Sequence, residues 1–240
     1  MPAGALERAV ELLGRLGTQP AAEWTVAALA SDIGMPTSTA YRLLAELEQH
    51  GLVARGPDRT VALGTRLVAL GRTAEAGLHE RVVAPAAAVM AQLSADVGET
   101  VILTAPCGPE AMVLHVAEAE LHSVRLSYAQ FRRAPMHRGA SGKILAAYLE
   151  PAERARLVAT VGRPELAGEL DRIRADGVAF TVGELDLGAA AVAAPVLDRR
   201  GRIVAGVSVA GPEARVVAER HRATAAVIAA ARRIERAQQE

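Results

Sequence analysis

The sequence predicts an α+β protein in which a small helical part precedes a larger part with helices around an antiparallel sheet. Apolar residues recur at intervals of three and four over the first fifty positions, which is the periodicity of an amphipathic helix. After position 100, short strand-like runs bounded by turn residues alternate with helical stretches, as in mixed domains. Apolar residues make up 51% of the 240 positions, which is enough to form the cores of both parts.

Composition restricts the class of protein. The formal net charge is zero, so any nucleic-acid site has to be a local patch. Cys107 is the only cysteine, which excludes an intramolecular disulfide and a cysteine-based metal cluster. Residues 1–10 lack the basic and then apolar layout of a signal peptide, and the longest apolar run, 189–197, is much shorter than a membrane span of about 20 residues. We therefore expect a cytoplasmic protein without a membrane partner.

Three helices are predicted before position 51. Thr25 is the expected N-cap of the second, Pro36 suits the first turn of the third, and Gly51 ends the third. Because the last two helices are short and joined by a turn containing glycine, they form a helix-turn-helix. The predicted apolar faces of the three helices are, in order, Leu6, Ala9, Val10 and Leu13; Val26, Leu29, Ala30 and Ile33; and Ala40, Leu43, Leu44 and Leu47.

Two short strands are expected after this motif. Residues 52–55 and 60–63 flank a turn at 56–59, so the pair forms a wing. The polar face of the third helix and the wing carry side chains that can bond base edges and phosphates of DNA. The candidate DNA-binding residues are Thr37, Ser38, Thr39, Tyr41 and Arg42 on the helix, and Arg55 and Arg59 on the wing.

Charge leaves a second interpretation open for this part. Residues 1–77 contain seven arginines and eight acidic residues, a net charge of −1. The third helix could therefore have an ordinary polar face. The winged surface could also contact a protein instead of DNA.

Several segments resemble the IclR family of bacterial transcriptional regulators. In the N-terminal part these are ALERAVELL at 5–13, SDIGMPTSTAYRLL at 31–44 and LGTRL at 63–67. In the C-terminal part they are two signature strands, VAAPV at 192–196 and GVSVAGP at 206–212. The family often has lysine or arginine where Thr37 stands, so we expect one phosphate contact fewer in this chain.

The resemblance implies a domain organisation and a set of partners. It implies a winged helix-turn-helix DNA-binding domain at 1–64, a linker helix at 65–77, and an effector-binding domain similar to GAF-type folds at 78–240. The implied partners are double-stranded promoter DNA, a small-molecule effector, and further copies of the chain in a homodimer or a dimer of dimers. No cofactor is expected. Members of the family repress or activate, and the sequence does not distinguish the two outcomes.

The C-terminal part is predicted to form one sheet flanked by helices. Its first helix presents Val83, Ala86, Met90 and Leu93 on one face. A turn at 106–109 joins the first two strands, because it contains two prolines and a glycine. The expected strands are 100–104, 111–116, 124–127, 178–182, 189–197 and 203–210, and the expected helices are 140–149, 152–160, 166–176 and 213–237.

The segment PMHRGASGKILAAY at 135–148 leads from a loop into a helix, and a helix start can bind an anion. It is not a Walker phosphate loop, because His137 stands where the first glycine is required and Ile144 follows Lys143. Ser141 and Lys143 are two positions apart on a helix, so their side chains point in different directions and do not suit a catalytic pair. A small carboxylate is the expected anion.

The resemblance places an effector pocket at this helix start, before the first signature strand, and on the inner faces of both signature strands. Ala191 stands where the family commonly has cysteine or serine, Ala210 replaces a common serine, and only Glu184 keeps the acidic character of its segment. We therefore expect an apolar pocket for a bulkier or aromatic acid, unless the alanines only pack the sheet. The candidate effector-binding residues carried over from the family are Met136, Ala140, Ser141, Thr181, Glu184, Ala191, Ser208 and Ala210.

Other kinds of site have little support. The six histidines show no metal-ligand spacing, so we predict no metal site. Besides a transcriptional regulator, two interpretations stay open. One is an enzyme that binds a small molecule, and the other is a protein-interaction scaffold with an accessory winged domain.

Overall fold

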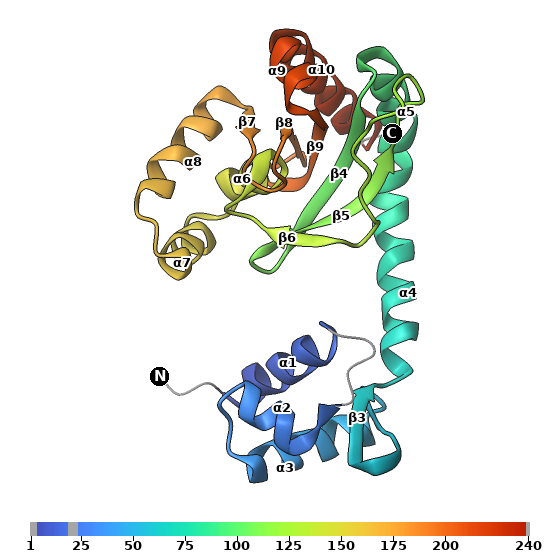
Figure 1. Cartoon of the computed structure of the whole chain (residues 1–240), viewed down its shortest axis with the longest axis vertical. Helices are drawn as coiled ribbons and strands as arrows, with labels where there is room; N and C mark the ends of the chain where they lie inside the picture. Colours follow the sequence, from blue (N-terminus) through green and yellow to red (C-terminus); the bar gives the residue numbers. More distant parts are fainter. Residues whose placement is uncertain (1–3, 19–23, 239–240) are drawn as a thin grey trace. The chain divides into compact units, whose positions relative to one another are not determined.

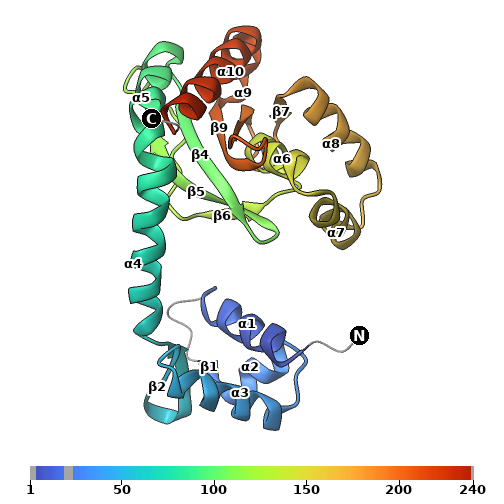
Figure 2. The same cartoon turned by 180° about the vertical axis from the view of Figure 1, so that it is seen from behind.

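The computed structural model describes residues 4–18 and 24–238 (Figures 1 and 2). Contacts divide the chain into an N-terminal unit, Met1–Gly77, and a C-terminal unit, Leu78–Glu240, and each has its own buried apolar core. Among the helices of the described segments, none is both long enough and apolar enough to span a bilayer.

The N-terminal unit is a winged helix-turn-helix. Its three helices pack beside a three-stranded antiparallel sheet in the order β1-β3-β2, with a short 3-10 turn, η1, at the tip of the wing. The sequence pattern does not predict β1, because a two-residue strand shows no periodicity. The elements are α1 (Ala5–Leu16), β1 (Trp24–Thr25), α2 (Val26–Asp32), α3 (Thr37–Gln49), β2 (Val53–Arg55), η1 (Pro57–Arg59) and β3 (Thr60–Leu63).

The faces predicted for α2 and α3 are confirmed, whereas half of the face predicted for α1 is wrong. In α1, Leu12 and Leu16 enter the core, and Leu6 and Val10 are 79% and 60% exposed. The reason is that apolar residues extend around much of this helix, so spacing alone does not select the buried side. The residues of α2 and α3 that lie in the core are Val26, Leu29, Ala30, Ala40, Leu43, Leu44 and Leu47, with Ile33 partly buried against them.

Thr25 caps α2 as predicted, since its hydroxyl accepts a hydrogen bond from the Ala28 N–H at 3.2 Å. Replacing it by alanine should destabilise the N-terminal unit by about 1 kcal/mol, because that N–H loses its partner. Trp24 is the only tryptophan, so its fluorescence in urea reports on this unit. Thr25→Ser keeps the accepting oxygen and should change the midpoint little; equal losses in both variants would contradict a capping role.

A helical stretch connects the two units along the chain. It consists of α4 (Arg66–Leu78), a π-helical turn η2 (His79–Val83) and α5 (Ala84–Val97). All residues of α4 are described, and none of them is buried. In contrast, the face predicted for the next helix is confirmed, because Val83, Ala86, Met90 and Leu93 are all buried.

The C-terminal unit contains a six-stranded antiparallel sheet in the order β6-β5-β4-β9-β8-β7. The two signature strands, in β8 and β9, are therefore neighbours, and neither is an edge strand. Its strands are β4 (Thr100–Cys107), β5 (Glu110–Ala117), β6 (Arg133–Pro135), β7 (Ala179–Val182), β8 (Ala189–Leu197) and β9 (Ile203–Pro212). Its remaining helices are α6 (Gly139–Tyr148), α7 (Pro151–Val161), α8 (Glu165–Asp176), α9 (Glu213–Ala218) and α10 (Arg220–Ala237).

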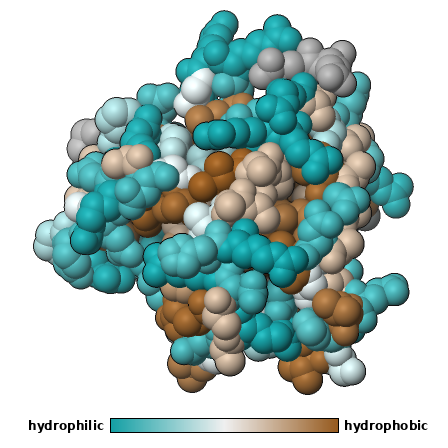
Figure 3. All heavy atoms as spheres, turned by 90° about the horizontal axis from the view of Figure 1, so that it is seen from above, coloured by the Kyte–Doolittle hydropathy of each residue, from teal (hydrophilic) through white to brown (hydrophobic). Residues whose placement is uncertain are grey.

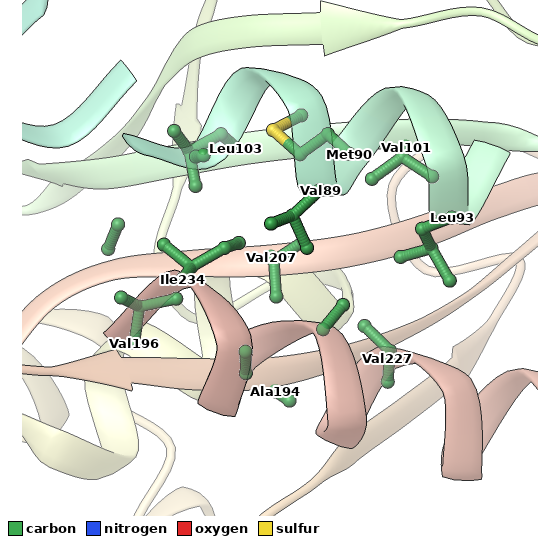
Figure 4. Close-up of a cluster of buried hydrophobic side chains, with 14 of the residues drawn as sticks. Val89, Met90, Leu93, Val101, Leu103, Ala194, Val196, Val207, Val227 and Ile234 are labelled. Atoms are coloured by element: carbon green, nitrogen blue, oxygen red, sulfur yellow. The ribbon is translucent and has the colours of Figure 1, made fainter. Parts of the chain in front are cut away.

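Helices cover both faces of this sheet. On one face, α5 and α10 pack against alternate residues of β4, β8 and β9, such as Leu103, Val196 and Val207 (Figure 4). On the other face, α6 lies against β8 and β9 and is itself covered by α7 and α8. Hydrophilic residues cover much of the molecular face seen in Figure 3, with apolar side chains exposed between them.

Three predicted elements of this unit are wrong in detail. The turn between β4 and β5 is only Gly108 and Pro109, so β4 continues through Cys107. Residues 124–127 form no strand, because side chains bind this segment: the Thr100 hydroxyl donates to the Leu126 carbonyl at 2.5 Å. The strand at the β5 edge of the sheet is instead β6, whose three residues include a proline and give no strand signal. The last predicted helix is interrupted at Glu219, which separates α9 from α10.

Candidate functional site

Helix α3 presents a polar surface because its opposite side is anchored in the core. Thr37, Ser38, Tyr41 and Arg42 are exposed, and Thr39 is half-buried. All five candidate residues therefore lie in the first turns of one helix. The free N–H groups of a helix start and these hydroxyl and guanidinium groups are donors that suit phosphates and base edges.

The arginines of this surface have acidic neighbours that the charge count alone does not reveal. Arg42 pairs with Glu46 one turn later, with 2.9 Å between Nη1 and Oε1. Arg55 pairs with Glu48 at 2.8 Å and lies 5.9 Å from the centre of the Tyr41 ring. Arg59 is exposed in the wing. Exposed pairs of this kind contribute at most about 1 kcal/mol, so a phosphate group can compete for both arginines.

The C-terminal unit has a pocket on the α6 side of its sheet. Its volume is about 60 Å³, counted as the space open to the centre of a water molecule. Strands β4, β5, β8 and β9 supply a mainly apolar wall, and the start of α6 closes one end. Two loops, one before β6 and one between β7 and β8, form the rim. The lining residues are Ile102, Thr104, Ala111, Val113, Tyr128, Arg132, Ala134, Arg138, Gly139, Ala140, Ser141, Gly142, Thr181, Glu184, Leu185, Asp186, Ala189, Ala190, Ala191 and Ala210.

Six of the eight candidate effector residues line this pocket, and two do not. The six are Ala140, Ser141, Thr181, Glu184, Ala191 and Ala210. Met136 is fully buried beneath α6 instead. Ser208 is also fully buried, and its hydroxyl oxygen lies 2.8 Å from that of Ser141, so it ties the start of α6 to β9.

At the start of α6, where a small carboxylate ligand is expected from the sequence, a carboxylate of the protein itself accepts the hydrogen bonds. The Gly139 N–H donates to Glu184 Oε2 at 3.1 Å, and Lys143 Nζ lies 2.6 Å from Glu184 Oε1. Lys143 is only 2% exposed, and it also contacts Glu169 at 2.5 Å. The Arg138 guanidinium donates to the Glu184 carbonyl from Nε at 2.9 Å and from Nη2 at 2.5 Å. The donors at this helix end are thus used within the chain.

A second polar group at the rim was not predicted from the sequence. The Tyr128 hydroxyl donates to Asp186 Oδ2 at 3.2 Å, and Arg132 Nη2 lies 3.4 Å from Asp186 Oδ1. The Arg132 guanidinium is 5.2 Å from the centre of the Tyr128 ring. Burial, together with the charge of Asp186, raises the pKa of Tyr128 to about 12, so its hydroxyl stays a donor at neutral pH.

Ser141 and Lys143 do not face one another as a catalytic pair would. The Ser141 hydroxyl contacts Ser208 on β9, whereas the Lys143 ammonium contacts the two glutamates. Nearby, burial and the positive charge of Arg138 lower the pKa of His137, which favours a neutral imidazole. Within residues 4–18 and 24–238, no three histidine, cysteine or acidic side chains come together as a metal site would require.

A winged helix-turn-helix linked to a pocket-bearing α+β unit defines a DNA-binding transcriptional regulator, and sequence comparison supports this class. Residues 5–57 match the IclR helix-turn-helix domain, and residues 77–236 match the bacterial transcriptional regulator IclR C-terminal domain. The chain belongs to the IclR family, as its resemblance to that family predicts.

Known relatives are similar along most of the chain. The HTH-type transcriptional regulator KipR of Bacillus subtilis is 30% identical over 207 residues, which cover 82% of each chain. The HTH-type transcriptional regulator BhcR of Paracoccus denitrificans is 30% identical over 243 residues, covering 96% of this chain and 85% of the relative. A solved IclR transcriptional regulator from Silicibacter sp. TM1040 has the same fold, with a TM-score of 0.79 at 24% identity over 98% of this chain and 96% of that chain. These matches are transcriptional regulators and not enzymes, which sets the enzyme interpretation aside.

Proposed function

We propose that this regulator binds promoter DNA sequence-specifically through α3 and the wing, and that a small organic acid in the pocket modulates the binding. The observation that carries the DNA-binding role is the polar start of α3, exposed opposite a fully buried apolar face. In this proposal, residues 1–64 bind DNA in the cytoplasm, residues 65–77 link the two parts, and residues 78–240 bind the effector.

The surface of α4 supports self-association. Val68 and Leu70 are more than half exposed on this helix. Burying exposed apolar side chains of a helix under another surface is energetically favourable, so such side chains often mark a contact with another chain. We assign α4 to contacts between copies in a homodimer or a dimer of dimers. The operator should then be close to a palindrome, with half-sites about one helical turn apart or a multiple of that distance.

The pocket supports the effector role through its shape and chemistry. Apolar strand residues form its wall, and Arg132 and Arg138 stand at its rim. The space open to the centre of a water molecule in this pocket is only about 60 Å³. A bulky or aromatic acid therefore requires movement of the rim. Such a ligand shifts operator binding only if it binds two arrangements of the protein with different affinity.

Replacing Arg42 by alanine should weaken operator binding by about tenfold to a hundredfold, because one base or phosphate contact contributes about 1–3 kcal/mol. The measurement is fluorescence anisotropy with a labelled operator fragment, selected first from genomic DNA. Random competitor DNA and two salt concentrations separate specific binding from phosphate contacts alone.

Arg156→Ala removes the same charge from an exposed position on α7 and serves as the control. It should leave operator affinity unchanged. Equal affinity of the Arg42 variant and the wild-type protein would contradict the assigned DNA surface. If the wild-type protein binds no DNA even at low salt, the interpretation of the winged unit as a protein-contact module gains support.

A further inference from the structure

One loop of the C-terminal unit accepts hydrogen bonds from donors around the pocket. Residues 183–188, called here the acidic loop, join β7 to β8 and carry Glu184 and Asp186. Gly183 and Gly188 at its ends have φ values of +65° and +74°, a left-handed conformation that favours glycine. The loop therefore has a permissive residue at each end, where its backbone direction can change.

The two acidic residues of this loop are held by contacts of unequal strength. Glu184 contacts Lys143, which is almost fully buried, and caps α6 at Gly139. Removing a partner of a buried charge is expensive, so Glu184 is a fixed part of the structure. Asp186 makes longer contacts of 3.2 and 3.4 Å, and its side chain and that of Arg132 are 38% and 40% exposed. A partly exposed pair with long contacts is readily exchanged for another carboxylate.

Arg132 and Tyr128 have the geometry of a carboxylate-binding pair. A guanidinium offers parallel N–H donors to the two oxygens of a carboxylate, and a phenol hydroxyl supplies a further donor. Both side chains line the pocket beside apolar wall residues such as Ala134 and Val113. A ligand with one carboxylate and an apolar body would satisfy the donors at the rim and the wall behind them.

We propose that Arg132 and Tyr128 are the carboxylate-recognition subsite of this pocket and that Asp186 is its internal competitor. A monocarboxylic acid takes the place of Asp186, and residues 185–188 of the acidic loop then move away from the rim while Glu184 stays in place. The inference rests on the proposed effector role of the pocket, and it assigns a positively charged recognition group that the candidate residues from sequence do not contain.

The test measures acid binding by the full-length protein without DNA, using isothermal titration calorimetry. The probes are butyrate, hexanoate, benzoate and phenylacetate, each with its primary amide as the uncharged counterpart. Asp186→Asn removes the competing charge and should tighten acid binding about two- to fivefold. Arg132→Ala removes a charge-assisted contact and should weaken it at least about tenfold. The amides should respond to neither substitution.

Arg125→Ala is the matched control, because Arg125 lies in the same loop as Tyr128 and pairs with Glu118 away from the pocket. Circular dichroism of the Arg132 variant shows whether it remains folded. If none of the acids binds either the wild-type protein or the Asp186 variant, or if folded Arg132→Ala binds them unchanged, the subsite assignment is wrong. If both substitutions change acid binding as expected but the bound acids do not alter operator affinity, the subsite is supported. The proposed effector role is then contradicted.

Discussion

Replacing both Glu169 and Glu184 by glutamine should lower the free energy of unfolding by about 3–5 kcal/mol, because it leaves the Lys143 ammonium without a charged partner. Lys143 is 2% exposed, so water does not replace the lost carboxylates. Its Nζ contacts lie at 2.5 and 2.6 Å. Urea unfolding followed by far-UV circular dichroism measures the loss. The same double variant also replaces the charged cap of α6 with a neutral amide.

Lys143→Met is the control that separates the charge from the packing. It keeps a long side chain in the core and leaves two carboxylates that are 29% and 34% exposed and can be hydrated. We therefore expect a smaller loss than in the double glutamine variant. Each single glutamine variant should also lose less, since one carboxylate remains beside the ammonium. A double variant within about 0.5 kcal/mol of the wild-type protein would show that the ion cluster contributes little.

Local periodicity predicts the parts of this fold that have one clear apolar face. In α3, apolar residues recur at 40, 43, 44 and 47 between polar ones, and all four are buried. In α1, apolar residues are spread more widely, and the predicted face includes the exposed Leu6 and Val10. The strand β6 is too short for any periodicity, and the segment 124–127 has strand-like residues whose hydrogen bonds go to side chains. Local patterns fail where tertiary contacts decide the outcome.

The polar parts of the candidate sites depend on contacts between distant positions. Lys143 meets Glu169 and Glu184 across 26 and 41 residues, and Tyr128 meets Asp186 across 58. No local pattern indicates such pairs. The family resemblance supplied eight pocket candidates, and six of them line the pocket. It did not supply Tyr128, Arg132 or Asp186. The nearest signal in the sequence is the pair of acidic residues between Gly183 and Gly188, which indicates a charged turn between two strands.

The junction between the wing and the linker helix gives the second large expected effect. A Cβ atom on Gly64 would lie 2.1 Å from the Gly51 carbonyl oxygen and 2.8 Å from the carbonyl carbon of Leu52. Both are backbone atoms, so no side-chain rotation relieves the clash. The Gly64 N–H also donates to the Leu52 carbonyl at 2.9 Å, and the Arg66 N–H donates to the Gly51 carbonyl at 3.3 Å. The start of α4 is thus fixed directly on the turn that ends α3, the helix proposed to contact DNA.

Gly64→Ala should therefore destabilise the N-terminal unit by at least about 3 kcal/mol, the upper end of the usual cost of overpacking. Operator binding should be lost with it, because the wing and α3 are held together at this contact. Gly14→Ala is the matched control: it lies in α1, a Cβ there meets nothing within 4 Å, and alanine should stabilise the helix by up to about 1 kcal/mol. Urea unfolding followed by Trp24 fluorescence compares the two variants. The changes in the free energy of unfolding should have opposite signs in the two variants. Of these two positions, only Gly64 has the backbone of another segment in the space that the added Cβ atom needs. A Gly64 variant as stable as the wild-type protein would show that this contact does not constrain the junction.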